Sequence, residues 1–426
     1  MTEAFIYYLW KYQLFTAPLF TMDGEEISVL KPGFQNTDSG PDFFNARIKI
    51  DKTIWVGNVE MHIRASDWYR HHHDSDAAYN NTILHVVFQC DKEVKTQDGQ
   101  VLQCLELADN FDNNSLRRYE YLLHNKNWIA CETSLNEFPD FEWKNWLERL
   151  VVERLERKSL FVEELLEQTN NDWEKAFFIT IAGYFGQRIN KLPFQILARS
   201  IDIKILAKHK DQPFQIEALL FGQAGMLEKD KGSDYQKRLI REYEFLAAKY
   251  KLTPMPAHLW KYMRLRPAAF PDIRIAQLAQ LISHNDFLFS RMLEIKDGKK
   301  LQDLFLAQAS KFWDEHYRFD VTSAKRAKKL GQLSRDGIII NAVIPFLFVY
   351  GKLHAQQVYT DLALDLLSQI SAEKNNITKK YAELAKPVAN ALESQALIEL
   401  KQSYCDFKKC LSCSVGHYLL RKNAIE

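Results

Sequence analysis

Acidic residues and histidines gather in one short stretch of the N-terminal part of the chain. Asp42 follows Pro41 in a turn, and Glu60-Met61-His62 lies in a strand-like run. Alternate side chains of a strand share one face, so Glu60 and His62 are expected to point the same way. Asp42 lies just before the preceding strand, and a hairpin would bring it beside Glu60. The spacing therefore predicts one acidic and imidazole-bearing site on a sheet.

Two neighbouring carboxylates bind Mg²⁺ or Mn²⁺ through oxygen. Such a metal activates water and stabilises a phosphoryl oxyanion. Asp42 and Glu60 are the predicted metal ligands. His62 is expected to join them, either positioning the attacking water or removing its proton. Asp42, Glu60 and His62 are thus the predicted catalytic residues.

This arrangement resembles the core of the PD-(D/E)xK nucleases, which have the restriction-endonuclease-like fold. In that family an acidic residue follows a turn, and the next strand carries a second acid, one spacer and usually lysine. Pro41-Asp42 matches the first element, and Glu60-Met61-His62 matches the second with histidine in place of lysine. The order of a helix, hairpin strands, a crossover and a further strand also fits. The resemblance implies a Mg²⁺- or Mn²⁺-dependent phosphodiesterase that acts on nucleic acid.

Two other interpretations of the same residues stay open. In one, a histidine-rich site binds Zn²⁺, Fe²⁺ or Mn²⁺, as in a cupin-like oxygenase or isomerase. Its ligands would be Glu60, His62, His71, His73 and His85. In the other, these are ordinary surface and turn residues, His85 is a buried hydrogen-bonded histidine, and the protein is a non-enzymatic scaffold with an inactive nuclease-like domain.

Three cysteines lie close together near the C-terminus, at Cys405, Cys410 and Cys413. The C-x2-C step lets two thiolates reach one metal, with the third nearby in sequence. A four-coordinate site needs one more ligand, for which we expect Cys131, with His417 as the competing choice. The pattern predicts zinc or an iron–sulfur cluster. Three reduced structural thiols are the alternative.

Arginines and aromatic residues gather in a proline-containing loop of the C-terminal part. Arg264, Arg266 and Arg274 follow Trp260 and Tyr262. Arginine contacts phosphate and aromatic rings stack on bases, so these arginines are the predicted nucleic-acid-binding residues. Arginines at helix ends and domain joints are the commoner alternative.

Two halves of the chain carry different patterns. A predicted helix at about 3–14 precedes strand-like runs at 46–50, 53–63, 82–89 and 101–107, separated by turn residues. From about Pro139 the apolar residues recur at helical spacing. We therefore expect an α+β protein, with a mixed nuclease-like sheet domain over 1–135. A large all-helical domain over 136–426, in one or two subdomains, would carry the terminal cysteines.

Composition limits the classes of protein. The 426 residues are 46% hydrophobic with a net charge of +1, which excludes a disordered or uniformly basic chain. Residues 1–135 hold 12 Lys+Arg and 19 Asp+Glu, whereas 136–426 hold 44 and 36. The net negative charge of residues 1–135 suits cation binding, and the net positive charge of residues 136–426 suits nucleic-acid binding.

Location and partners are predicted from what the sequence lacks. No signal-peptide pattern opens the chain. The longest apolar run, 337–350, falls short of the roughly 20 residues that span a bilayer. We expect a cytoplasmic protein without a membrane partner, and its oligomeric state stays open.

The whole chain also resembles members of a bacterial family catalogued only as a domain of unknown function. The resemblance rests on short motifs spread over most of the chain, and on the terminal cysteines. These motifs are Ser39-Gly40-Pro41-Asp42-Phe43, Gly57-Asn58-Val59-Glu60-Met61-His62, Leu84-His85-Val86-Val87 and Arg264-Leu265-Arg266-Pro267. The family implies no activity.

Overall fold

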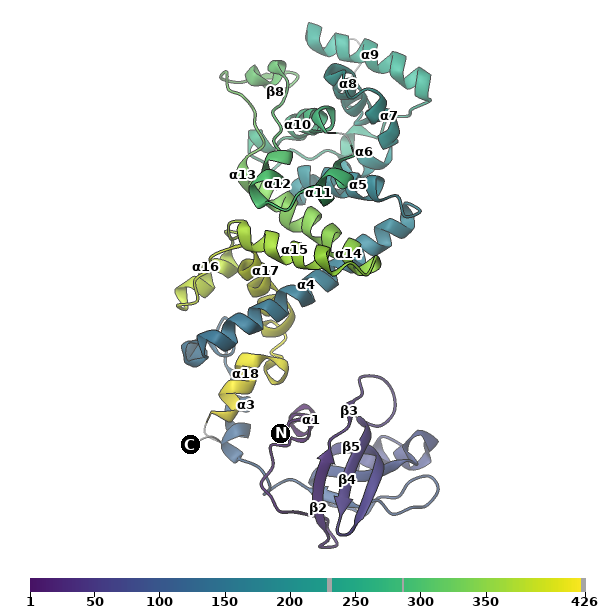
Figure 1. Ribbon diagram of the computed structural model, residues 1–426, viewed down its shortest axis with the longest axis vertical. Coiled ribbons are helices and arrows are strands. Elements are labelled where there is room, and N and C mark those ends of the chain that lie inside the picture. The colour runs from purple at the N-terminus through teal and green to yellow at the C-terminus, as the bar shows by residue number, and fades with distance from the viewer. Residues whose placement is uncertain (228–231, 286, 423–426) are drawn as a thin grey trace. The chain divides into compact units, whose positions relative to one another are not determined.

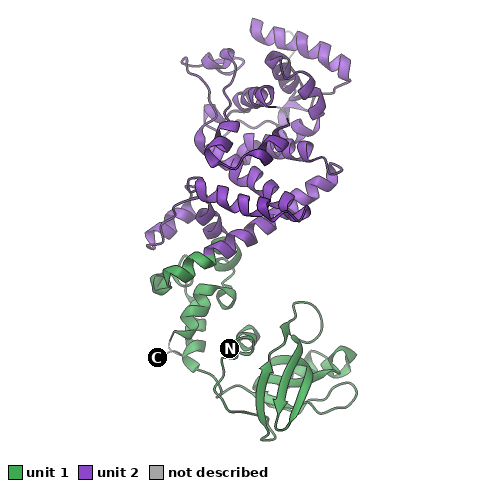
Figure 2. Ribbon diagram, in the orientation of Figure 1, with its two compact units in different colours: residues 1–146, 400–426 green, residues 147–399 purple. Residues whose placement is uncertain are grey.

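The computed structural model describes residues 1–227, 232–285 and 287–422. The chain forms two compact units, shown in Figure 2. The first comprises residues 1–146 together with 400–426, and the second comprises 147–399. The expected α+β class is confirmed, because a mixed sheet near the N-terminus is followed by a large helical region. The segment with the terminal cysteines belongs to the first unit.

The first unit is built around a mixed sheet (Figure 1). Its main strand order is β1-β2-β4-β5-β6-β7, and β3 pairs with β4. Strands β2, β4 and β5 are antiparallel, whereas β6 runs parallel to β5 and β7 parallel to β6. The strands are β1 (Leu19–Phe20), β2 (Glu26–Lys31), β3 (Phe34–Gln35), β4 (Phe43–Ile50), β5 (Thr53–Arg64), β6 (Thr82–Gln89) and β7 (Cys104–Glu106).

The central strand β5 forms a hairpin with β4 and a parallel pair with β6. In the parallel pair, Glu60 lies opposite His85 and His62 opposite Val87. A parallel neighbour requires a crossover, and the expected polar segment supplies it. The crossover contains only short helical turns, namely α2 (Asp67–Arg70), η1 (His73–Ser75) and η2 (Ala77–Tyr79).

Each face of the sheet has its own apolar cluster. Helix α1 (Glu3–Lys11) places Ile6 and Trp10 on one face, against Val59 and Met61 of β5. The other face is covered by the crossover, whose cluster comprises Ala65, Trp68, Tyr79, Val87, Val94, Leu102 and Cys104. Residues of β5 therefore alternate between two different packing layers.

A helical group completes the first unit. It comprises α3 (Asn113–His124), η3 (Glu132–Glu137) and the C-terminal η8 (Leu400–Cys405), η9 (Cys410–Ser412) and α18 (Ser414–Arg421). Phe5 of α1, Tyr119 of α3 and Leu420 of α18 share one apolar cluster. The N-terminal helix thus connects the sheet to the C-terminal segment.

In the residues of the second unit that the structure describes, the named strands are the short hairpin of β8 (His316–Arg318) and β9 (Val321–Thr322), and the other elements are helical. Helix α4 (Asp140–Gln168) leads into it. Its other α-helices are α5 (Trp173–Phe185), α6 (Gln187–Arg199), α7 (Ile203–Lys208), α8 (Pro213–Gln223), α9 (Asp234–Tyr250), α10 (Pro271–His284), α11 (Leu288–Glu294), α12 (Gly298–Leu304), α13 (Gln332–Ile338), α14 (Ile344–Leu353), α15 (Gln357–Gln369), α16 (Asn376–Glu383) and α17 (Ala391–Glu399). The shorter turns are η4 (Ala257–Leu259), η5 (Pro267–Ala269), η6 (Lys311–Glu315) and η7 (Ile339–Val343).

One continuous apolar helix runs from Gln332 to Leu353, through α13, η7 and α14. Among the described residues it alone is long and apolar enough to cross a membrane. Its most apolar stretch is 72% buried inside the protein, as in the core helix of a soluble protein.

A glycine sets how closely β5 approaches the start of β6. A Cβ atom at Gly57 would lie 2.4 Å from Ile83 Cγ2 and 2.7 Å from the Asn81 backbone oxygen. We therefore predict that Gly57→Ala lowers the free energy of unfolding by about 1–3 kcal/mol, the usual cost of overpacking. Urea denaturation, with hydrogen exchange read at β5 and β6, measures this change.

The control is Gly337→Ala in α13, where a Cβ atom would meet no heavy atom within 4 Å. This variant should lose no stability, because alanine favours a helix over glycine. Equal stability of the two variants would show that the approach of β5 to β6 is not tight at Gly57.

Candidate metal centre

Strand β5 presents Glu60 and His62 on the face that the crossover covers. Their neighbours Val59 and Met61 enter the opposite apolar cluster, as the strand alternation predicts. Glu60 is only 4% exposed and His62 only 1% exposed. A carboxylate and an imidazole this deeply buried need polar partners, because burying an unpaired polar group is costly.

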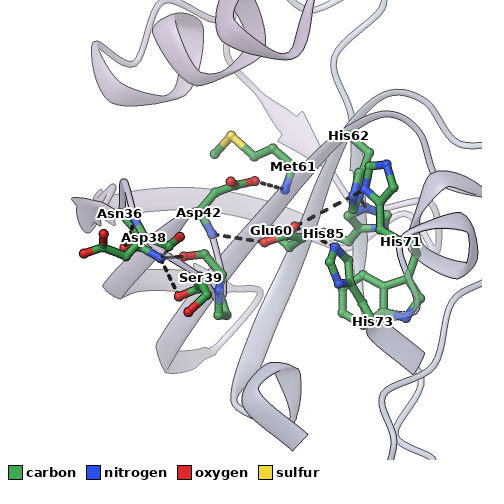
Figure 3. A network of polar contacts seen from close by, with 12 residues as sticks. Asn36, Asp38, Ser39, Asp42, Glu60, Met61, His62, His71, His73 and His85 are labelled. Atoms are coloured by element: carbon green, nitrogen blue, oxygen red, sulfur yellow. Dashed lines mark hydrogen bonds and ion pairs between the residues drawn. The ribbon is translucent and has the colours of Figure 1, made fainter. Parts of the chain in front are cut away.

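The crossover returns two histidines to these side chains (Figure 3). His71 Nδ1 lies 3.0 Å from His62 Nε2, and His73 Nε2 lies 3.2 Å from Glu60 Oε1. His62 Nε2 is 3.8 Å from Glu60 Oε1. One ring nitrogen from each of His62, His71 and His73 lies within 4.8 Å of the others. Zinc ligands at about 2.0–2.1 Å in a tetrahedron are separated by about 3.3–3.4 Å, so the spacing matches one shared ion.

The local backbone directs His71 and His73 inward and leaves His72 outside. His72 has a φ of +63°, a left-handed conformation that reverses the chain between its two neighbours. Its carbonyl accepts a hydrogen bond from Ser75 Oγ at 2.9 Å. The ring of Tyr79 stacks on His73 with centroids 3.9 Å apart. The inward direction of the two histidines is therefore fixed by the crossover itself.

Asp42 holds Glu60 from the side opposite the histidines (Figure 3). The Asp42 backbone N–H donates to Glu60 Oε2 at 3.0 Å. The Asp42 carboxylate accepts from the Met61 backbone N–H at 3.0 Å, and it is hydrogen-bonded to Tyr7 of α1. This reciprocal pair satisfies polar groups next to the Phe43 and Val59 pair of the β4–β5 ladder. The structure thus brings Asp42 and Glu60 together. The Asp42 carboxylate is engaged by the Met61 backbone N–H and by Tyr7.

His85 lies behind His62, away from the ligand group. His85 Nε2 is 2.8 Å from His62 Nδ1. If His62 Nε2 offers its lone pair to a metal, Nδ1 carries the proton and donates it to His85. Such outer partners fix the tautomer and ring orientation of a metal ligand. His85 thus suits a positioning role in the predicted metal set.

Burial sets the charge of the group. It raises the pKa of Glu60 to about 8 and, helped by the charge of Glu60, that of Asp42 to about 7. Burial and the neighbouring histidines lower the pKa of His62 to about 2, and burial lowers that of His85 to about 3. The buried imidazoles are therefore neutral at physiological pH and keep lone pairs for a cation.

The ligand types select among metals. Three imidazole nitrogens and one carboxylate oxygen suit Zn²⁺, Mn²⁺ or Fe²⁺ better than Mg²⁺, which prefers oxygen and keeps its waters. His71 is exposed, so the group reaches solvent on that side. The arrangement presents three ring nitrogens and one carboxylate oxygen to a metal.

The structure brings together the predicted residues Asp42, Glu60, His62 and His85. His71 and His73 were expected only in the histidine-rich interpretation, and the geometry places them in the centre. Tyr7 was not expected, because no local pattern links a helical tyrosine to a turn 35 residues later.

The predicted nucleic-acid-binding arginines lie in the second unit. Arg264 and Arg266 are exposed in the loop before α10. Arg274 is buried in α10, where its guanidinium donates to Gln277 Oε1 at 3.0 Å and to Ser334 Oγ at 3.2 Å. Arg264 and Arg266 are therefore the two that a ligand can reach.

The cysteine residues Cys131, Cys405, Cys410 and Cys413 all belong to the first unit. All six cysteines of the chain are described, and none of them forms a disulfide bond.

Comparison with protein-family models matches residues 3–376 to the family described as "Protein of unknown function (DUF2851)". The match spans most of the chain and confirms the family resemblance expected from the sequence. No curated protein and no solved structure matches the chain.

We predict that the metal-free protein binds one Mn²⁺ ion at this centre, and that His71→Ala or His73→Ala weakens binding by more than about tenfold. Losing a direct ligand should cost at least as much as losing an outer partner. Isothermal titration with Mn²⁺ measures the affinity, and this ion favours nitrogen and oxygen over thiolate ligands.

The matched control is His72→Asn, because His72 lies between the two ligands and asparagine tolerates its left-handed backbone. Its affinity should equal that of the wild type. Equal weakening in all three variants would indicate a general disturbance of the crossover instead of ligand loss.

A second prediction concerns His85. His85→Leu removes the acceptor for His62 Nδ1–H and should weaken Mn²⁺ binding by about 10–100-fold. His85→Gln keeps an acceptor near the position of Nε2 and should restore most of the affinity. A purely structural role for His85 would give no such rescue in the same titration.

Proposed function

This chain belongs to the DUF2851 family of proteins of unknown function, and we propose that it is a metal-dependent phosphodiesterase that cleaves nucleic acid. The observation that carries the proposal is the convergence of His62, His71, His73 and Glu60 on one point of the sheet. Since buried neutral imidazoles beside a carboxylate form a site for a divalent cation, the centre supports metal-assisted hydrolysis.

The order of elements supports the choice of a phosphodiester substrate. Helix α1, the antiparallel strands β2, β4 and β5, the crossover and the parallel strand β6 follow one another as in the PD-(D/E)xK nucleases that the sequence resembles. Asp42 immediately precedes β4, and Glu60-Met61-His62 lies within β5. These positions support the proposal, because the resemblance puts one acid after a turn and the other in the next strand.

The roles within the site differ from those expected of a two-carboxylate Mg²⁺ site. Glu60, His62, His71 and His73 would be the metal ligands, and Asp42 would position Glu60 through its backbone N–H. A bound metal supplies Lewis acidity and lowers the pKa of a coordinated water. Held by Glu60, His62, His71 and His73, such a metal would supply the activated water and the charge stabilisation that hydrolysis of a phosphodiester requires.

Substrate would be held partly by the basic helical region. Residues 136–426 carry the excess of Lys and Arg that offsets the acidic N-terminal part. Arg264 and Arg266, both exposed, are the proposed phosphate contacts. We place this activity in the bacterial cytoplasm, where free thiols such as the six found here persist.

The alternatives receive less support. A cupin is a double-sheet jelly roll, whereas the sheet here has parallel pairs between β5, β6 and β7. The protein therefore has the imidazole and carboxylate ligands of a cupin-like enzyme but not the jelly-roll architecture of a cupin. A scaffold with an inactive domain leaves the convergence of four ligand groups unexplained.

The proposal predicts cleavage of labelled single- or double-stranded DNA or RNA by the full-length protein with Mn²⁺ or Zn²⁺, and weaker cleavage with Mg²⁺. Glu60→Gln and His71→Ala should each lower the rate by at least about 100-fold, as when one electrostatic stabiliser of a transition state is removed. Gel analysis of the products over time gives the rates.

His72→Asn serves again as the matched variant and should cleave at the wild-type rate. Cleavage that persists unchanged in Glu60→Gln and His71→Ala would assign the activity to a contaminant or another site. Absence of cleavage with every substrate and metal, in a protein that binds Mn²⁺, would favour the scaffold.

A further inference from the structure

The C-terminal segment brings three cysteines into the first unit, after the chain has passed through the second. Cys405 ends η8, Cys410 begins η9 and Cys413 directly precedes α18. Cys131 directly precedes η3. Cys131 and Cys410 both pack against the apolar cluster that includes Phe5 and Leu420. Residues distant in sequence thus meet beside α1.

Backbone hydrogen bonds fold the three terminal cysteines into consecutive tight turns. The Lys408 N–H donates to the Cys405 carbonyl at 3.1 Å, and Lys408 has a left-handed φ of +50°. The Cys413 N–H donates to the Cys410 carbonyl at 3.3 Å. A Cβ atom at Gly416 would lie 2.0 Å from that same carbonyl oxygen, so the first turn of α18 lies directly on Cys410.

The segment is also tied to the chain just before Cys131. Lys408 Nζ donates to the backbone carbonyl of Asn125 at 2.8 Å and to that of Leu123. Asn125 in turn donates from its side chain to the carbonyl of Ala130. These bonds hold the loop that carries Cys131 against the turn between Cys405 and Cys410.

We propose that Cys131, Cys405, Cys410 and Cys413 form a four-thiolate metal centre that fastens the C-terminal segment to the sheet-bearing unit. The metal is thiophilic, either zinc or the iron of an iron–sulfur cluster, since both take four cysteine thiolates. This centre is separate from the histidine centre and does not depend on the proposed nuclease activity.

The other three cysteines lie near enough to Cys131 to interact with its thiol electrostatically. Burial raises the pKa of Cys131 well above its usual range, and the charges of Cys405, Cys413 and Cys410 raise it further. The Cys413 thiolate is favoured by the backbone amides of Gly416 and Val415, which oppose the effect of burial on its pKa.

His417, the competing choice for the fourth ligand, is hydrogen-bonded to side chains of α1 and α18. Its Nδ1 is 3.0 Å from the hydroxyl of Tyr8, and its Nε2 is 3.2 Å from Arg421 Nη1. Both ring nitrogens therefore have partners in α1 and α18. Cys131 packs, like Cys410, against the apolar cluster beside α1.

The test is the metal content of the full-length protein purified without oxygen, measured by elemental analysis and visible absorbance. One zinc per chain in the double variant His71→Ala/His73→Ala, which lacks the histidine centre, identifies the zinc form, and iron with acid-labile sulfide and a visible band identifies the cluster. Cys410→Ser and Cys413→Ser should each lower that metal at least tenfold. Cys90→Ser, which removes a thiol outside the group, and the double variant His71→Ala/His73→Ala should retain it.

Protein that contains neither metal, and takes up neither zinc nor a reconstituted cluster, would overturn the proposal. Metal content unchanged by the cysteine substitutions would overturn it too.

Whether the metal fastens the C-terminal segment is tested without mutation, by removing the metal with a chelator and then restoring it. Hydrogen exchange over 400–422 should accelerate at least tenfold on removal and return on restoration. A hydrogen-exchange rate that stays the same when the metal is removed would contradict the fastening role.

Discussion

The parallel pairing of β5 with β6 is the constraint on which the candidate metal centre depends. Parallel neighbours require a crossover, and crossovers of this kind are right-handed in almost all proteins. Handedness fixes which face of the sheet the connecting segment covers. Here it covers the face of Glu60 and His62, so His71 and His73 arrive over them without further elements. The register that sets Glu60 opposite His85 also places His85 behind His62.

The centre concentrates polar groups where a protein interior normally excludes them. Glu60, His62 and His85 are almost fully buried, yet each has a partner in the group. Burial holds the imidazoles neutral and raises the pKa of both carboxyl groups, so the protein alone carries little charge there. A divalent cation would favour the ionised carboxylates and accept the imidazole lone pairs together.

Local patterns predicted the elements well where they were regular. The strand expected at 82–89 is β6 to the residue, and the run at 53–63 differs from β5 by one residue. The helix expected to 14 ends at Lys11, because the chain turns into a left-handed conformation at Gln13. Strands β1, β2 and β3 were missed, and for the two-residue β1 and β3 the reason is that so short a segment carries no periodic signal.

The site was predicted in part, for a physical reason. Strand alternation placed Glu60 and His62 on one face, and the hairpin placed Asp42 beside them. The exchange of hydrogen bonds between Asp42 and Glu60 depends on where the β4–β5 ladder ends, which sequence does not specify. The selection of His71 and His73 over His72 depends on one left-handed residue in an irregular crossover. Such turns are set by tertiary packing, here by Trp68 and Tyr79 against His73.

The coordination of a bound ion tests this account most directly. X-ray absorption at the manganese edge of the Mn²⁺-loaded protein reports the ligand atoms, and a variant with Cys410→Ser and Cys413→Ser removes thiolate competition. The account predicts three imidazoles and additional oxygen ligands around each ion. A shell of oxygen atoms alone, without imidazole scattering, would contradict the metal centre built on β5 and its crossover.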